Sequence, residues 1–176
     1  MDNIKNIVVG GVLTLVVGGS AFTFSQQDVV NNFASDTGLT QEQAEVYVAN
    51  ISEEEMVTFE KAGNDYISES RITLGLAVEI DCVNYTYEWE SASLSCSQGK
   101  AQLEQIARTE LALGESYIAL AADDATEADI QTTINYLDRM NSDYDLPIVK
   151  AYFTDIQEMR MTNSYNKSIF VTALEQ

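Results

Sequence analysis

Residues 7–24 read IVVGGVLTLVVGGSAFTF, eighteen consecutive positions without a charged side chain. An α-helix of this length spans about 27 Å, close to the thickness of a thin hydrocarbon core. Helices that are apolar on every side are unusual in small soluble proteins. The stretch therefore predicts an apolar N-terminal helix, either a retained transmembrane anchor or a cleaved signal peptide.

The segment carries signs of both forms. Small residues at positions 19–21 precede Phe22, as a signal peptidase site requires. Phe22 and Phe24 extend the apolar run beyond that site, which favours the retained anchor. Glycines recur at spacings of seven and eight, and in a helix they would form a face on which another membrane helix could pack closely. These glycines are Gly10, Gly11, Gly18 and Gly19.

Charges on either side of the segment predict its orientation. Lys5 precedes it, whereas Asp28 and Asp36 follow it and the next basic residue is Lys61. Positive charge stays on the cytoplasmic side of a membrane helix. We therefore expect a single-pass membrane protein whose C-terminal domain lies outside the cytoplasm, in the periplasm, in a lumen or at the cell surface.

Cys82 and Cys96 are the only cysteines. An even number of cysteines behind an export segment predicts a disulfide. The spacing is not that of a C-x-x-C redox motif. Two thiolates without a histidine are also too few ligands for a tetrahedral zinc site.

The composition narrows the function. The chain has 28 acidic and 9 basic residues, a net charge of −19 and no histidine. Such a polyanion repels phosphates, so nucleic-acid binding is not expected. The missing histidine removes the Ser-His-Asp and Cys-His nucleophile systems. We expect no catalytic, cofactor or metal site; the acidic charge indicates either solubility in a salty habitat or a face that docks a basic partner.

The rest of the chain is predicted to be an acidic helical bundle, so the fold class is all-α. One proline and nine glycines leave few helix breakers. Capping boxes, in which two side chains satisfy each other's backbone donors, mark helix starts. These pairs are Thr40 with Gln43, Ser52 with Glu55, and Thr126 with Asp129. Apolar stripes predict helices over residues 52–80, 97–122, 127–140 and 149–159, followed by a short helix or tail.

The chain is expected to divide into three parts: an anchor or signal segment (1–25), a connector (26–39) and an extracytoplasmic domain (40–176).

Two structures are possible around residues 72–98. Tyr85, Tyr87 and Trp89 alternate with polar residues, which is typical of a strand and allows a small β-hairpin closed by the disulfide. A helical hairpin turning near Trp89 would instead place Cys82 and Cys96 seven residues to either side, facing each other, and we favour it. The three aromatic residues are also a candidate interaction surface, although core packing or contact with lipid headgroups would suit them equally.

One acidic loop resembles the start of a calcium-binding loop. Asn141, Asp143 and Asp145 stand at alternate positions. Leu146 and Tyr152 occupy the places where an EF-hand needs glycine and glutamate. The EF-hand interpretation therefore fails.

These features predict a non-catalytic, membrane-anchored accessory or structural subunit whose acidic extracytoplasmic domain docks a protein partner. A soluble exported binding or inhibitor protein with a cleaved signal peptide is the second hypothesis, and a structural subunit of a filament or virion is a variant of the first. A carboxylate-dependent hydrolase is a further hypothesis, and it predicts a cleft that holds two facing acids.

Overall fold

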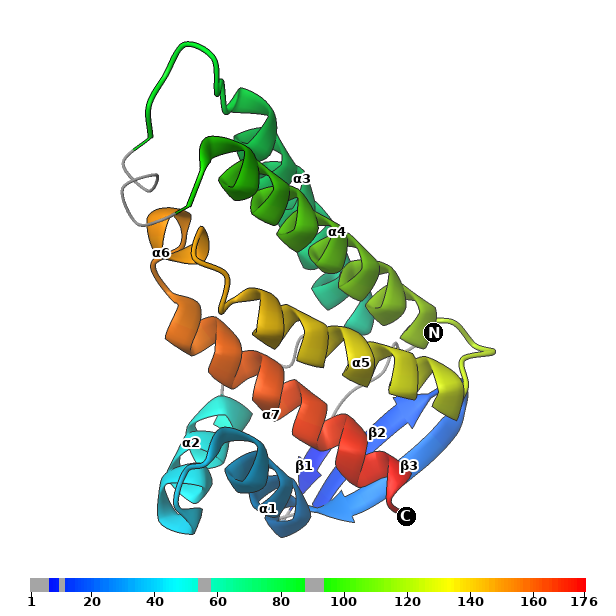
Figure 1. Ribbon diagram of the computed structural model, residues 1–176. Helices are drawn as coiled ribbons and strands as arrows, with labels where there is room; N and C mark the ends of the chain where they lie inside the picture. The colour runs from blue at the N-terminus through cyan, green and yellow to red at the C-terminus, as the bar shows by residue number, and fades with distance from the viewer. Residues whose placement is uncertain (1–6, 10–11, 54–57, 88–93) are drawn as a thin grey trace.

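The computed structural model describes residues 7–9, 12–53, 58–87 and 94–176 (Figure 1). Most of these residues are helical, and a small antiparallel sheet precedes the helices. The strands are β1 (Ile7–Val9), β2 (Val12–Val17) and β3 (Ser20–Ser25). The helices are α1 (Gln26–Thr37), α2 (Gln41–Glu53), α3 (Phe59–Glu79), α4 (Cys96–Leu120), α5 (Glu127–Asp143), α6 (Val149–Tyr152) and α7 (Ile156–Leu174).

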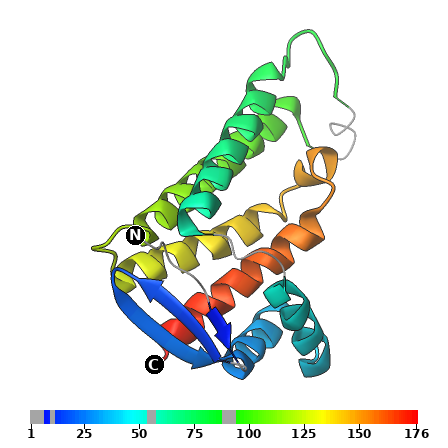
Figure 2. The same cartoon turned by 180° about the vertical axis from the view of Figure 1, so that it is seen from behind.

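The helices α3 and α4 pair as a long hairpin that projects from the rest of the molecule (Figures 1 and 2). Helix α4 packs on α5, α5 packs on α7, and α1 with α2 covers the other side of α7. The sheet lies near the C-terminal end of α7, which contacts β3. The far end of the hairpin is therefore distant from both the sheet and the C-terminus.

The segment expected to be an apolar helix forms strands instead. Strand β2 pairs antiparallel with β1 and with β3, in the order β1-β2-β3. Gly18 and Gly19 have φ of 55° and 77° and connect Val17 to Ser20. Two successive residues at positive φ suit tight hairpin turns, which is the physical reason for the difference: glycine adopts these angles without strain. Gly10 and Gly11 lie outside the described residues.

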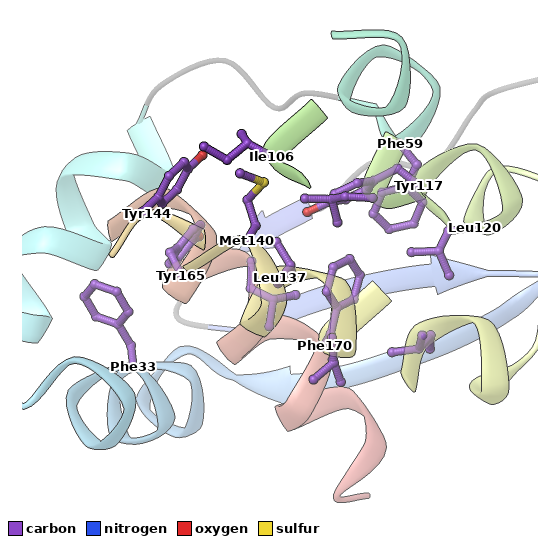
Figure 3. Packing of buried hydrophobic residues seen from close by; sticks show 14 of the residues in the cluster. Phe33, Phe59, Ile106, Tyr117, Leu120, Leu137, Met140, Tyr144, Tyr165 and Phe170 are labelled. Carbon is purple, nitrogen blue, oxygen red and sulfur yellow. The ribbon is translucent and has the colours of Figure 1, made fainter. Parts of the chain in front are cut away.

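The strands contribute to the main core. Alternate residues of β2 are buried, namely Leu13, Leu15 and Val17. They belong to the same hydrophobic cluster as Phe33 of α1 and Phe170 of α7 (Figure 3). The expected N-terminal segment and connector thus share one core with the helices. Within the described residues, no helix is both long and apolar enough to cross a membrane.

Two predicted helices and two predicted caps are confirmed. Helices α4 and α5 cover the stretches expected from their apolar stripes. The Thr40 N–H donates to Gln43 Oε1 at 3.0 Å, and the Gln43 N–H donates back to Thr40 Oγ1 at 3.3 Å. The Thr126 N–H donates to Asp129 Oδ2 at 2.7 Å. Local capping chemistry therefore sets these helix starts.

Two helix boundaries differ from the prediction. Ser52 lies inside α2, Glu55 is outside the described residues, and α3 begins after Thr58, whose hydroxyl accepts from the Lys61 N–H at 3.1 Å. The helix expected after Pro147 is broken: α6 ends at Tyr152, the backbone of Phe153 is extended, and α7 then runs unbroken to Leu174. The last segment is therefore a long buried helix rather than a tail.

Candidate functional site

The connection between α3 and α4 forms the projecting tip of the hairpin. A disulfide joins Cys82 to Cys96 with their Cα atoms 5.6 Å apart, as the sequence predicted. Helix α3 ends at Glu79 and α4 begins at Cys96, so the arms are helical but neither reaches Trp89 as expected. The described part of residues 80–95 holds no strand. The disulfide therefore closes a loop at its base rather than crossing two helices.

A hydrogen-bonded turn centred on Asp81 orders the first half of this loop. The Asp81 carboxylate accepts from the Val83 N–H at 2.9 Å, the Asn84 N–H at 3.2 Å and the Asn84 side-chain amide at 2.7 Å. These bonds, led by the one from the Asn84 side chain, lower the Asp81 pKa. The Asp81 N–H donates to the Tyr87 hydroxyl at 2.7 Å. Residues 81–87 are thus held in place by their own side chains.

The second half of the loop ends in a capping box. The Ser95 N–H donates to Gln98 Oε1 at 2.9 Å, and the Gln98 N–H donates to Ser95 Oγ at 3.3 Å. This pair satisfies free donors at the start of α4. Together with the neighbouring disulfide, it fixes where the loop rejoins the hairpin.

The tip presents apolar side chains to solvent. Val83 is 90% exposed and Tyr85 is 67% exposed. A shallow groove of about 570 Å³ runs beside Val83 between the end of α3 and the start of α4. It is lined by Val78, Ile80, Asp81, Cys82, Val83, Ser97, Lys100, Ala101 and Glu104. Exposed apolar side chains beside a groove are typical of binding surfaces.

The three aromatic residues of the predicted interaction surface separate. Tyr85 points into solvent, whereas Tyr87 is half-buried against the hydrophobic core and its hydroxyl is bonded to Asp81. Trp89 lies outside the described residues. Val83 was not singled out in the sequence, and no pattern distinguished it, because a lone valine in a loop carries little signal.

The tip is acidic. Residues 81–95 contain Asp81, Glu88 and Glu90 and no lysine or arginine. Asp81 and Glu104 line the groove, and Lys100 is the one basic residue among the groove-lining residues. Two acidic residues and one basic residue therefore line the groove beside the exposed Val83.

A second polar feature lies in the interior, where α4 packs between α3 and α5. Glu110 is only 2% exposed, and Asp143 is equally buried. Asp143 accepts from Thr109 Oγ1 and from Gln105 Nε2, both at 2.5 Å, and its Oδ1 lies 3.4 Å from Arg139 Nε. Asp143 is therefore compensated by donors on α4 and by one cation.

Glu110 lacks this compensation. The Thr73 hydroxyl hydrogen-bonds to its carboxyl, but within the described part of the chain its Oε2 has no hydrogen-bond partner. Burial raises the Glu110 pKa to about 7; the bond from Thr73 lowers it, and the carboxyls of Glu69 and Asp143 raise it further. Glu110 was missed in the sequence, although it falls on the helical spacing between Ile106 and Leu113.

The acidic loop that resembles a calcium loop does not bring its side chains together. Asp143 faces the interior, Asn141 bonds to Ser164 at 3.2 Å, and Asp145 pairs with Arg160 at 2.5 Å. Across residues 7–9, 12–53, 58–87 and 94–176, no cluster of three or more acidic or cysteine side chains is placed to hold a metal ion.

The fold and these two features provide the grounds for a functional proposal. Comparison with protein-family models, curated proteins and solved structures finds no match to this chain.

Proposed function

We propose that this protein is a non-catalytic docking protein that works outside the cytoplasm and binds a basic protein partner through the tip of the α3–α4 hairpin. The observation that carries the proposal is the exposure of Val83 and Tyr85 on a loop tied down by the disulfide and by the Asp81 turn. A loop that is ordered before binding loses little entropy on complex formation. Tyrosine is enriched among the residues that supply most of the energy of protein interfaces, and an exposed valine beside it adds apolar area that a partner can bury.

The charge of the protein supports a cationic partner. The net charge is −19, and Asp81 and Glu104 flank the groove beside Val83. A field of one sign attracts an oppositely charged partner and speeds association, and salt screens this effect. Binding should therefore weaken as the salt concentration rises.

The disulfide supports a location outside the cytoplasm. Disulfides persist in oxidising compartments and are rare in the reducing cytosol. We expect Cys82 and Cys96 to resist alkylation in protein taken from its native cells and to react only after reduction. Intact-mass measurement with and without a reductant checks this. Two alkylated cysteines before reduction would contradict the proposed location.

The burial of β2 favours a docking protein that keeps residues 7–24 in its core over the membrane-anchored subunit. Insertion of residues 7–24 into a bilayer or an assembly would remove Leu13, Leu15 and Val17 from the core. The anchored form therefore needs a rearranged domain, and so does a form cleaved before Phe22, which would lose β2. A docking protein that keeps residues 7–24 uses the core as it stands. The buried acids Glu110 and Asp143 give little support to a hydrolase, because a substrate cannot reach side chains with so little exposure.

Photo-crosslinking in the native cells tests the docking surface. A photoreactive phenylalanine at position 83 should capture a protein with a basic surface segment, and the same probe at position 46 should not. Val46 is a fair control, because it is also exposed and apolar but lies on α2 in another part of the molecule.

The captured partner then allows a quantitative test. We expect Val83→Ser, which removes apolar area without adding a charge, to weaken its binding by about 10-fold, the loss expected for one buried valine side chain, and Val46→Ser to have little effect. Both affinities can be measured by calorimetry at low and high salt. Equal effects at the two positions, or an acidic partner, would contradict the proposal.

A further inference from the structure

The projecting hairpin meets the body of the molecule across an interface that contains ionisable groups. On the hairpin side, α4 contributes Glu110 and α3 contributes Tyr66. On the body side, α5 contributes Asp143, and α7 contributes Asn163, whose Oδ1 accepts from the Tyr66 hydroxyl at 2.6 Å. The hairpin is thus held to the body partly by polar groups.

The two carboxyls of this interface have very different surroundings. Asp143 receives two short hydrogen bonds and faces Arg139, so its negative charge is balanced. Glu110 has one hydroxyl donor, from Thr73, and faces two other carboxyls, Glu69 and Asp143. A buried carboxylate without a cation is costly unless it binds a proton.

We propose that Glu110 is a proton-binding switch for the packing of the α3–α4 hairpin against α5. With its proton, Glu110 is neutral and the interface closes. Without it, an uncompensated charge lies beside the Asp143 carboxylate, and the hairpin loosens from the body. This inference does not depend on the docking surface proposed above, although it concerns the same hairpin.

The direction of the pH effect follows from the pKa values. The pKa of Glu110 is raised from an ordinary value of 4.5 to about 7 in the folded protein. The folded state therefore binds the proton more tightly than the unfolded state. The stability that this proton binding by Glu110 contributes is complete below about pH 4.5 and is lost as the pH rises through about 7. The pH window of the switch thus reaches neutrality.

The other ionisable groups around Glu110 do not reverse this sign. From α3 it faces Glu69 and Tyr66, from α5 it faces Asp143, and it also faces Tyr144, the residue that follows α5. Burial raises the pKa of both tyrosines well above the ordinary value, so they remain neutral. The remaining neighbours are carboxyls, and their negative charge adds to the cost of ionising Glu110.

Urea denaturation of the full chain between pH 4.5 and pH 9 tests the switch. The variants are Glu110→Gln, which mimics the neutral side chain, and Glu115→Gln, which removes an exposed charge from the same helix. Relative to Glu110→Gln, the folding equilibrium constant of the wild-type protein should fall on the order of 100-fold over this range. Glu115→Gln should follow the wild type. Parallel profiles for wild type and Glu110→Gln would overturn the proposal.

Two further measurements remain decisive even if Glu110→Gln folds poorly. Carboxyl NMR of the wild-type protein should give a Glu110 titration midpoint near 7, lowered by Glu69→Gln; a midpoint below 5 would overturn the proposal. Hydrogen exchange, corrected for its intrinsic pH dependence, should show lost protection in α4 and α5 at pH 8 while α1 and α2 keep theirs. A uniform loss of protection would overturn the proposed loosening of the hairpin.

Discussion

Leu15→Ala is expected to destabilise the protein by about 2–5 kcal/mol, the usual cost of truncating a buried leucine. Leu15 is 1% exposed in the middle of β2, where it pairs with Phe22 of β3. A cavity of about 60 Å³ already lies beside it, lined also by Phe59 and Tyr117. Because the substitution enlarges an existing void, little of the lost contact can be recovered. Chemical denaturation of the purified domain measures the effect.

Val12→Ala is the matched control for this prediction. Val12 lies on the same strand but is 42% exposed, so its truncation should change the free energy of unfolding by only about 0.5 kcal/mol. The difference between the two variants tests whether the sheet packs on the helices. Small and equal effects at positions 12 and 15 would contradict that packing.

The N-terminal segment shows why hydrophobicity alone misassigned a secondary structure. Its uniform apolar character fits a membrane helix, a signal peptide and a buried strand equally well. The distinguishing feature was the pair Gly18–Gly19 between a run rich in β-branched residues and a run with two phenylalanines, which is a hairpin signal. Which face of β2 would be buried could not be predicted, because both faces are apolar and the helices that cover it lie far along the chain.

The helices were easier to predict because their signals are local. Capping pairs and apolar stripes placed α4 and α5 closely, since both signals depend on residues only three or four positions apart. The break before α7 was missed. Apolar residues occur at helical spacing both before and after the polar pair Thr154 and Asp155. The sequence pattern therefore does not indicate the extended backbone at Phe153.

The candidate sites could be predicted only in part. The cysteine pair followed from counting, and the loop between the cysteines was recognised as aromatic-rich. Glu110 was overlooked because only apolar residues were used to identify the buried face of α4. Ser70 and Thr73, two polar residues on the stripe of α3 that faces α4, were the missing clue. Both are buried: the Ser70 hydroxyl donates to the Ala107 carbonyl at 2.8 Å, and Thr73 hydrogen-bonds to Glu110. Polar residues on two facing stripes predict a buried polar layer.

Gly114→Ala is expected to destabilise the protein by about 1–3 kcal/mol, although alanine is the better helix former. Helices α3 and α4 approach closely where Gly63 faces Gly114. A Cβ added at Gly114 would lie 2.7 Å from the Gly63 carbonyl oxygen and 3.0 Å from the Ile67 amide nitrogen. Both are backbone atoms of a helix, which cannot rotate away, so the two helices must move apart and loosen the packing along the hairpin. Thermal or chemical denaturation measures the loss.

Gly75→Ala separates this steric effect from helix propensity, because its expected effect has the opposite sign. Gly75 lies in α3, and an added Cβ there would meet nothing within 4 Å. Alanine should therefore stabilise the helix by about 0.5–1 kcal/mol through the lower entropy of the unfolded chain. If Gly114→Ala stabilised the protein as Gly75→Ala does, the backbones of the two helices could not lie in close contact at Gly63 and Gly114. Opposite signs in one hairpin would instead establish that the Gly63–Gly114 contact sets how closely its arms pack.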